Sequence, residues 1–390
     1  MSILNQIIKK NDCIIDFLMD YNKNDLSIFG ILGINLTLIN YGINKNDESY
    51  ISKALQNIEN IQSKLQNNIK TISVYGQGLI SLGVFIDYIE KYQIADIDSN
   101  LLKVIIYSGF QNGTLLLKSN NLDFVAGATG IGFYFVNKIQ KVNFAHNFLS
   151  EWVNKTYNLT KNKIIVYDKH LSNNNKKIIN LGLAHGLTNI LKLALKLNKI
   201  EFETHKTRII INKIIQFYKN IVTIENEYFY PHTITNSVIN KDFKSRMAWC
   251  YGDLSLAYIL YQASLFLNDL ELNHLALNIL KQTTIRKKIE ETQVVDASLC
   301  HGSSGIAHIY NKIFNYTNDE VFRTAHTFWL QYTLNLAHNK NGTLGYIIPN
   351  NTDKKKEVGL LSGIAGISLS FQSSIFNTFD WDFCLLLDEI

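Results

Sequence analysis

The stretch HGSSGIAH (residues 301–308) holds the pattern that decides the fold. Gly302 is followed three residues later by a second glycine and four residues later by the aliphatic Ile306. The step from a glycine to an aliphatic residue recurs in seven copies, spaced 46 to 66 residues apart, and four copies carry the second glycine. The leading glycines are Gly30, Gly76, Gly127, Gly186, Gly252, Gly302 and Gly363. Self-similarity at such intervals is typical of a repeat architecture.

Segments of helical period lie between the glycine turns. In SYISKALQNIENIQSKLQN (49–67) the apolar residues recur at steps of three and four, which predicts an amphipathic helix. By contrast, GILGINLTLINYG (30–42) is apolar nearly all round, as a more buried helix should be. Each repeat therefore predicts an amphipathic outer helix, a glycine turn and a buried inner helix. Seven such pairs closing into a ring predict an all-α fold, a single-domain α/α toroid over residues 1–390.

Composition narrows the class of protein. The chain of 390 residues is 46% hydrophobic and 18% charged, and its net charge of +5 is spread without a dense basic run, which argues against nucleic-acid binding. The N-terminus lacks the ordered regions of a signal peptide, and no apolar run reaches the length of a membrane helix. Four cysteines without close pairing spacing do not form a disulfide framework. We therefore expect a cytoplasmic protein.

Reactive side chains occupy equivalent places in three consecutive repeats. Cys250 lies two residues before its turn glycine, Cys300 and His301 lie two and one before theirs, and His185 directly precedes Gly186. Two thiolates and an imidazole converging on the mouth of a ring form a soft site that suits Zn²⁺. Three protein ligands leave a fourth position open, as in a catalytic zinc site. At this point His185 is a possible fourth ligand or a neighbour.

The remaining cysteines and histidines have no comparable position. A lone cysteine is more often a small buried hydrophobe than a ligand, and we interpret Cys13 and Cys384, near the termini, as structural. We interpret His232, His308 and His326 as surface or core residues.

Three motifs resemble those of a known family. GLAHG (182–186), RMAWCYGD (246–253) and LCHGSSGIA (299–307) are similar to the signatures of the lanthionine synthetase C-like family, the lantibiotic cyclases. The seven glycine turns resemble that family's α/α toroid, so the resemblance covers nearly the whole chain. Members of this kind bind one zinc ion through the cysteine of W-C-Y-G and both residues of C-H-G. The resemblance thus implies Cys250, Cys300 and His301 as ligands.

The resemblance also implies residues beside the metal. It makes His185 an acid/base candidate rather than a fourth ligand, with water in the fourth position. It implies Asp123, four residues before the third turn glycine, Arg246, four residues before the first zinc cysteine, and Tyr251, directly after that cysteine. The third turn, AGATG (126–130), departs mildly from the family pattern.

The implied reaction is thioether formation in a ribosomally made peptide. A separate dehydratase converts Ser or Thr to dehydroalanine or dehydrobutyrine, and the cyclase adds a cysteine thiolate of the same peptide across the double bond, forming (methyl)lanthionine. The partners implied are the dehydrated precursor peptide, that dehydratase and an export transporter, with peripheral membrane association through partners. Since the seven repeats fill the chain, we expect a stand-alone cyclase.

Other functions fit parts of the pattern. Family members elsewhere bind small thiols such as glutathione or add them to dehydrated residues. A non-catalytic toroid with a structural zinc is a second alternative, although structural zinc normally has four protein ligands. A prenyltransferase subunit would use a different ligand set. Finally, ENEYFYPHTITNSV (225–238) has strand character, so we expect a substrate-facing loop or a small insertion around 201–245.

Overall fold

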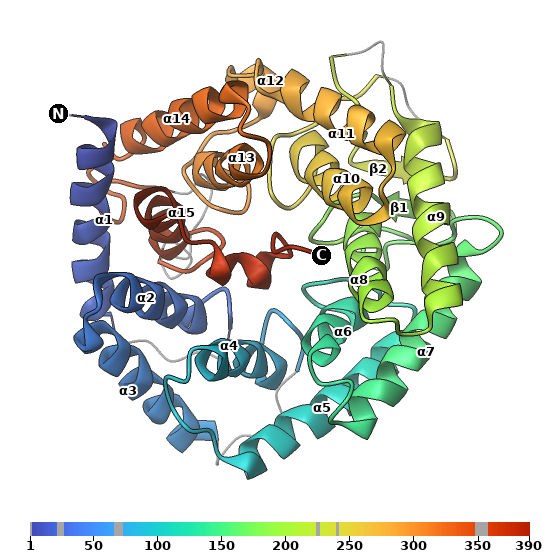
Figure 1. Ribbon diagram of the computed structural model, residues 1–390, viewed down its shortest axis with the longest axis horizontal. Helices are drawn as coiled ribbons and strands as arrows, with labels where there is room; N and C mark the ends of the chain where they lie inside the picture. The colour runs from blue at the N-terminus through green and yellow to red at the C-terminus, as the bar shows by residue number, and fades with distance from the viewer. Residues whose placement is uncertain (1, 22–26, 66–72, 224–226, 239–241, 348–357) are drawn as a thin grey trace. The chain divides into compact units, whose positions relative to one another are not determined.

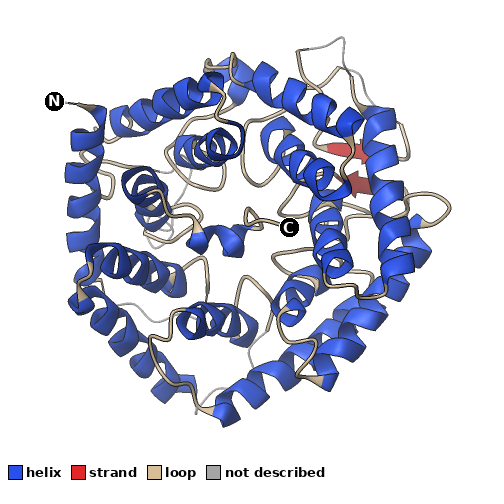
Figure 2. Ribbon diagram, viewed as in Figure 1, coloured by secondary structure: helices blue, strands red, loops and turns tan. Residues whose placement is uncertain are grey.

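The computed structural model describes residues 2–21, 27–65, 73–223, 227–238, 242–347 and 358–390. In these ranges the chain forms fifteen α-helices, one 3-10 helix and two short strands (Figures 1 and 2). Contacts divide the chain into two compact units. Unit 1 holds residues 1–72, 77–97 and 294–388, and unit 2 holds residues 73–76, 98–293 and 389–390. The expected single domain over 1–390 stays a prediction.

Unit 1 is built from helices at both ends of the sequence. Its elements are α1 (Ile3–Met19), α2 (Ile31–Lys45), α3 (Glu48–Leu65), α4 (Leu79–Lys91), α13 (Ser303–Thr317), α14 (Glu320–Asn335), α15 (Ile364–Phe376) and the 3-10 helix η1 (Asp380–Leu385). Within the unit, α2 packs on α3 and α13 packs on α14, while α15 contacts α1, α2 and α13. The first and last helices of the sequence are therefore neighbours.

Unit 2 contains the middle of the sequence. Its helices are α5 (Ser99–Lys118), α6 (Ala128–Val136), α7 (Asn143–Thr160), α8 (Leu187–Lys199), α9 (Thr204–Ile221), α10 (Asp253–Leu267), α11 (Leu270–Thr283) and the short α12 (Ile289–Thr292). The strands β1 (Ile178–Asn180) and β2 (Thr233–Thr235) pair antiparallel, with Ile179 opposite Ile234. The strand character expected within residues 225–238 is thus confirmed. The interval 201–245 contains α9 and β2.

The alternation of buried and amphipathic helices is confirmed. The helices α2, α4, α6, α8, α10, α13 and α15 each begin directly after a glycine. These helices are buried nearly all round. By contrast, α9 buries only one face, whose residues recur at helical spacing from Thr207 to Ile221. In the second copy the helix starts after Gly78 rather than Gly76, because Gly78 adopts a φ of 82° that favours glycine.

The second glycine of the turn lets two backbone segments touch. In three copies, a Cβ atom added there would lie 1.9 Å from a carbonyl oxygen six residues earlier in the chain. The pairs are Gly130 with Phe124, Gly305 with Leu299 and Gly366 with Leu360. Only glycine permits this approach. The second glycine therefore allows each turn to pack closely against the start of the following helix.

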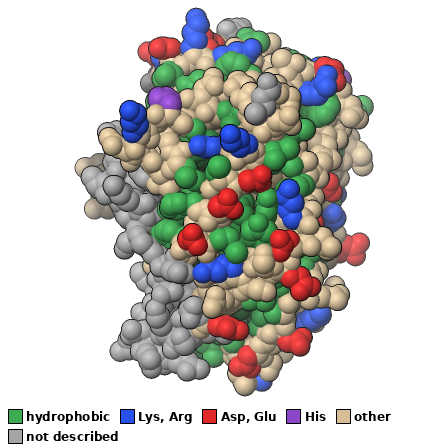
Figure 3. All heavy atoms as spheres, turned by 90° about the vertical axis from the view of Figure 1, so that its left-hand side faces the viewer, with side chains coloured by type: hydrophobic (Ala, Val, Ile, Leu, Met, Phe, Trp, Pro, Cys, Tyr) green, Lys and Arg blue, Asp and Glu red, His purple; other side chains and the backbone are tan. Residues whose placement is uncertain are grey.

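The surface carries charges of both signs. Figure 3 shows the face of the molecule on which α1 lies, where acidic and basic side chains are interspersed among apolar ones. Of the helices in the described ranges, none has the length and apolar character needed to cross a membrane.

Candidate functional site

An aspartate and a histidine from two turns of unit 2 form a close pair. Asp123 precedes α6, and its Oδ1 accepts a hydrogen bond of 2.7 Å from the backbone N–H of Ala126. Its Oδ2 lies 2.6 Å from His185 Nδ1. The carboxylate is 8% exposed and the imidazole is 47% exposed. The turn thus holds the carboxylate rigidly, and the other side of the ring faces solvent.

The environment raises the pKa of His185. Burial acts against the charged ring, but the hydrogen bond and the negative charge of Asp123 outweigh it, with further help from Cys250 and Asp168. A positive charge on the ring is therefore favoured by its acidic neighbours. The pair that the sequence proposed, His185 with Asp123, is brought together in the structure.

The first expected zinc cysteine lies beside the same histidine. Cys250 is buried, and its carbonyl accepts a hydrogen bond of 3.0 Å from the N–H of Ala184, the residue before His185. A Cβ atom at Gly182 would lie 2.7 Å from that carbonyl oxygen. The first glycine of GLAHG thus allows the Cys250 turn to pack against the His185 turn, which places the two functional side chains in one part of unit 2.

Arg246 and Tyr251 are also neighbours. Arg246 Nη1 lies 3.5 Å from the Tyr251 hydroxyl, at the long limit of a hydrogen bond, and Nη2 donates to the carbonyl of Gln293 at 3.0 Å. Gly252 makes this fold of the chain possible: its φ is 104°, and a Cβ atom there would lie 1.8 Å from the Arg246 carbonyl oxygen. The turn therefore folds Arg246 back toward the residues that follow Cys250.

His232 supports this arrangement. Its Nε2 accepts a hydrogen bond of 2.9 Å from the backbone N–H of Arg246, and its ring centroid lies 4.5 Å from that of Tyr251. Burial and the charge of Arg246 lower the pKa of His232 to about 4, so the ring is a neutral acceptor. This role could not be predicted from the glycine pattern, because His232 lies beside β2 and outside the glycine turns.

A cavity opens beside the Asp123–His185 pair. The space within it is about 340 Å³ including open solvent, and its lining includes Tyr167, Asp168, Lys169 and His170 from the segment between α7 and β1. Asp168 is fixed by a hydrogen bond of 3.0 Å from Asn180 Nδ2. The sequence analysis missed Asp168, since its segment has no counterpart in the other repeats.

The C-H-G motif lies in unit 1, directly before α13. The N–H of Cys300 donates to the carbonyl of Leu361 at 2.8 Å, which fixes the cysteine backbone. His301 Nε2 lies 3.0 Å from Asp296 Oδ2, with the two side chains 26% and 1% exposed. Burial acts to raise the pKa of Asp296, but His301 and Ser298 outweigh it and the pKa is lowered. Asp296 is a second residue that sequence reasoning missed.

The donor set fits a zinc ion chemically. None of the four cysteines, all within the described ranges, forms a disulfide. With His301 Nε2 turned toward Asp296, Nδ1 would be the ring atom left for a metal. The expected ligands are divided between the units, with Cys250 in unit 2 and Cys300 and His301 in unit 1. Within either unit, the part that the structure describes brings no three His, Cys, Asp or Glu side chains together around one metal position. The complete ligand set stays a prediction.

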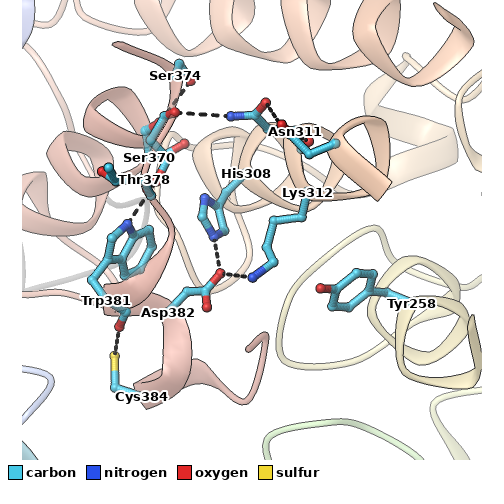
Figure 4. Close-up of polar contacts among 12 residues, drawn as sticks. Tyr258, His308, Asn311, Lys312, Ser370, Ser374, Thr378, Trp381, Asp382 and Cys384 are labelled. Carbon is cyan, nitrogen blue, oxygen red and sulfur yellow. Dashed lines mark hydrogen bonds and ion pairs between the residues drawn. The ribbon is translucent and has the colours of Figure 1, made fainter. Parts of the chain in front are cut away.

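Among the other singled-out residues of unit 1, His308 and Cys384 lie in the core and His326 is part-buried. Cys13 is exposed, so the structural interpretation of this cysteine is not supported. Asp382 Oδ2 accepts hydrogen bonds from His308 Nε2 at 2.9 Å and from Lys312 Nζ at 2.6 Å, which ties η1 to α13 (Figure 4). His326 Nδ1 donates to the carbonyl of Ala307 at 2.8 Å. Burial raises the pKa of the Cys384 thiol well above its usual range, so it is unreactive. These contacts agree with a structural interpretation.

A family model and a solved structure each match most of the chain. The family model described as "Lanthionine synthetase C-like protein" matches residues 22–386. A solved structure named "Nisin cyclase" is similar with a TM-score of 0.72 at 19% sequence identity, over 98% of this chain and 97% of that one. No curated protein matches by sequence. At 19% identity the structural likeness shows the fold alone, and it confirms the expected all-α toroid class. The chain belongs to the lanthionine synthetase C-like family.

Proposed function

We propose that this protein is a zinc-dependent peptide cyclase that forms (methyl)lanthionine rings in lantibiotic biosynthesis. The observation that carries the proposal is the pair of Asp123 and His185, 2.6 Å apart, beside the turn of Cys250 and at the edge of a cavity. The family match and the likeness to a protein named nisin cyclase support the same reaction class.

The reaction needs a nucleophile and a proton donor. A cysteine thiolate of the peptide forms a C–S bond to the β-carbon of a dehydroalanine or dehydrobutyrine residue, and the electron pair of the double bond moves toward the α-carbon and its carbonyl. A proton then reaches the α-carbon. The thiol proton has left and another has been added, so the mass of the peptide is unchanged.

The expected zinc ligands would activate the nucleophile, which is a cysteine of the peptide. Cys250, Cys300 and His301 would hold the zinc, which when bound keeps the substrate sulfur as a thiolate. Two thiolate ligands favour an electron-rich site, which keeps that sulfur reactive. The fourth position is left to water or substrate.

His185 is suited to deliver the proton. Its Nδ1 faces Asp123, which leaves Nε2 to face the peptide. A raised pKa keeps a larger fraction of the ring protonated near neutral pH. Asp123 therefore acts through His185, as the group that orients the ring and favours its charged form.

Arg246 and Tyr251 complete the proposed machinery. The charge on the transition state develops at the carbonyl oxygen next to the α-carbon, and a fixed cation or hydroxyl donor stabilises such charge. Arg246 is held by Gln293 and lies 3.5 Å from the Tyr251 hydroxyl. We assign this stabilising role to Arg246, with Tyr251 as its neighbour.

The substrate is a dehydrated precursor peptide. A separate dehydratase must supply it, and a transporter would remove the cyclised product. The hollow beside His185 is lined by polar side chains such as Asp168 and Lys169, and it lies where the peptide would meet the proton donor.

Thiol counting tests this function. The protein is incubated with a dehydrated peptide, and remaining thiols are alkylated and counted by mass, since cyclisation itself leaves mass unchanged. The proposal predicts fewer alkylated cysteines with time. Peptide cysteines that all remain alkylatable would refute it. A peptide that gains the mass of an added small thiol would instead indicate intermolecular addition.

A further inference from the structure

We propose that Asp296 is the positioning residue of His301, holding its Nε2–H so that Nδ1 is presented to the metal. This inference rests on the zinc-dependent function proposed above and concerns a residue outside the family motifs. It begins from the contact of 3.0 Å between His301 Nε2 and Asp296 Oδ2.

Asp296 is held in place by its own turn. Its Oδ1 accepts a hydrogen bond of 2.8 Å from the N–H of Ser298, and its carbonyl accepts one of 3.0 Å from the N–H of Ser303, the first residue of α13. The side chain is 1% exposed. Oδ2 has no hydrogen-bond partner in the described ranges, although His301 Nε2 lies only 3.0 Å away. A buried carboxylate oxygen needs a partner, and a small rotation of the His301 ring would let its Nε2–H supply one.

The same position in other turns carries asparagine. Asn121 and Asn180 each stand six residues before a turn glycine, as Asp296 does. Asn121 Oδ1 accepts from the N–H of Asp123 at 3.3 Å, and Asn180 Oδ1 accepts from the N–H of Gly182 at 2.9 Å. The turn therefore forms equally well with an amide. The carboxylate of Asp296 is therefore not required to close the turn, and it serves another role.

That role follows from the chemistry of the ring. A neutral imidazole carries one N–H, and an ionised carboxylate only accepts hydrogen bonds. Its contact with Nε2 therefore selects the tautomer with the proton on Nε2 and the lone pair on Nδ1. Nδ1 of His301 makes no hydrogen bond to any residue in the described ranges. A carboxylate behind a histidine ligand fixes its orientation and raises its basicity.

An asparagine at position 296 would reverse this preference. In both natural examples, Oδ1 binds the backbone and Nδ2 donates elsewhere, from Asn121 to the carbonyl of Ala126 at 3.1 Å and from Asn180 to Asp168 at 3.0 Å. An amide held in the same way at 296 would point an N–H at His301 Nε2. That donor favours the tautomer whose proton sits on Nδ1, the nitrogen that the metal needs.

The test measures zinc affinity rather than activity. Zinc dissociation constants are determined by competition with a chromophoric chelator for the wild type and for Asp296→Asn. We expect zinc binding to weaken by on the order of 10- to 100-fold, while the thermal stability of the metal-stripped protein stays near that of the wild type because the turn is kept. Cobalt substitution gives a second readout, with ligand-field bands that weaken or shift in the variant.

The control is Asp382→Asn in the same unit. Asp382 is also 1% exposed and also contacts a histidine, His308, which is not an expected ligand. This variant should lose stability but keep zinc affinity.

Should Asp296→Asn not fold, Asp296→Ser replaces it, because a hydroxyl keeps the turn without reaching the ring. A folded 296 variant that binds zinc as tightly as the wild type overturns the inference, whereas a wild type that binds no zinc refutes the proposed zinc dependence instead.

Discussion

At the scale of single residues, the proposed proton transfer depends on the contact between Asp123 and His185. Asp123 is held by the backbone of its own turn, while His185 lies at the surface of unit 2 with about half of its side chain exposed. A rigid acceptor and an accessible ring form the arrangement that general acid catalysis needs, since the ring must meet the substrate while keeping its orientation.

Replacing His185 by Asn should slow cyclisation sharply. The amide keeps polar character but donates no acidic proton, so we expect a loss of about 10²- to 10⁴-fold in rate. Zinc content should be unchanged, which metal analysis checks. If rate and stereochemistry of the product stayed normal with zinc bound, His185 would not be the proton donor.

Replacing Asp123 by Asn should move the pH–rate profile. A proton donor works below its pKa, so activity falls as pH rises through the pKa of His185, which Asp123 raises. Loss of the carboxylate lowers that pKa, and the declining limb should shift to lower pH. Asp168→Asn is the matched control, with a smaller shift because Asp168 contributes least to the pKa. An unshifted limb in Asp123→Asn would contradict the assignment.

At the scale of elements, the glycine turns decide where helices begin. In α6 two glycines lie on one short helix with different surroundings. A Cβ atom at Gly130 would lie 1.9 Å from the carbonyl oxygen of Phe124, whereas one at Gly132 would lie 2.6 Å from the end of the Leu193 side chain. Backbone cannot move aside as a side chain can.

Gly130→Ala should therefore destabilise the protein, by on the order of 1–3 kcal/mol, and Gly132→Ala should cost little because alanine's helix preference offsets the displacement of Leu193. Thermal unfolding of the two variants makes the comparison. Equal stability of both would show that the turn glycine has no packing role.

Buried histidines should make stability fall in mild acid. Burial lowers the pKa of His326 to about 4, against the hydrogen bond to Ala307, while an unfolded histidine titrates near 6.5. Between these pH values the unfolded state binds more protons than the folded state. The stability that comes from keeping His326 neutral is therefore present above pH 6.5 and is lost as pH falls toward 4. Going from pH 7 to pH 5 should lower the free energy of unfolding by about 2 kcal/mol through His326. Urea unfolding of His326→Gln should show a weaker pH dependence, and an unchanged dependence would contradict the sign or the site.

At the scale of the whole molecule, the sequence predicts the fold class well and the site in part. Seven glycines in register locate the buried helices, because a local backbone requirement repeats. The same register predicts Cys250, Cys300 and His301 as zinc ligands, a set that stays a prediction. It does not identify His232, Asp168 or Asp296, whose roles depend on which side chain each one contacts after folding. Asp296 shares its turn position with Asn121 and Asn180, but the contact with His301 distinguishes it only in three dimensions.

Both cysteine motifs should be needed for one metal. We expect about one zinc per chain in the wild type and nearly none in either Cys250→Ala or Cys300→Ala, because each variant removes one of three ligands. Cys384→Ala, a buried thiol outside the motifs, is the control and should keep its zinc. Full zinc content in a Cys250 or Cys300 variant would exclude that cysteine as a ligand.

Zinc reconstitution during cyclisation decides whether the reaction depends on the metal. Metal-stripped protein is incubated with a dehydrated peptide, with and without one equivalent of Zn²⁺, and the peptide thiols that remain are alkylated and counted by mass. The account predicts that alkylatable thiols disappear only when zinc is restored. Thiols that remain fully alkylatable with zinc bound, or that disappear equally fast without it, would contradict a zinc-dependent cyclase.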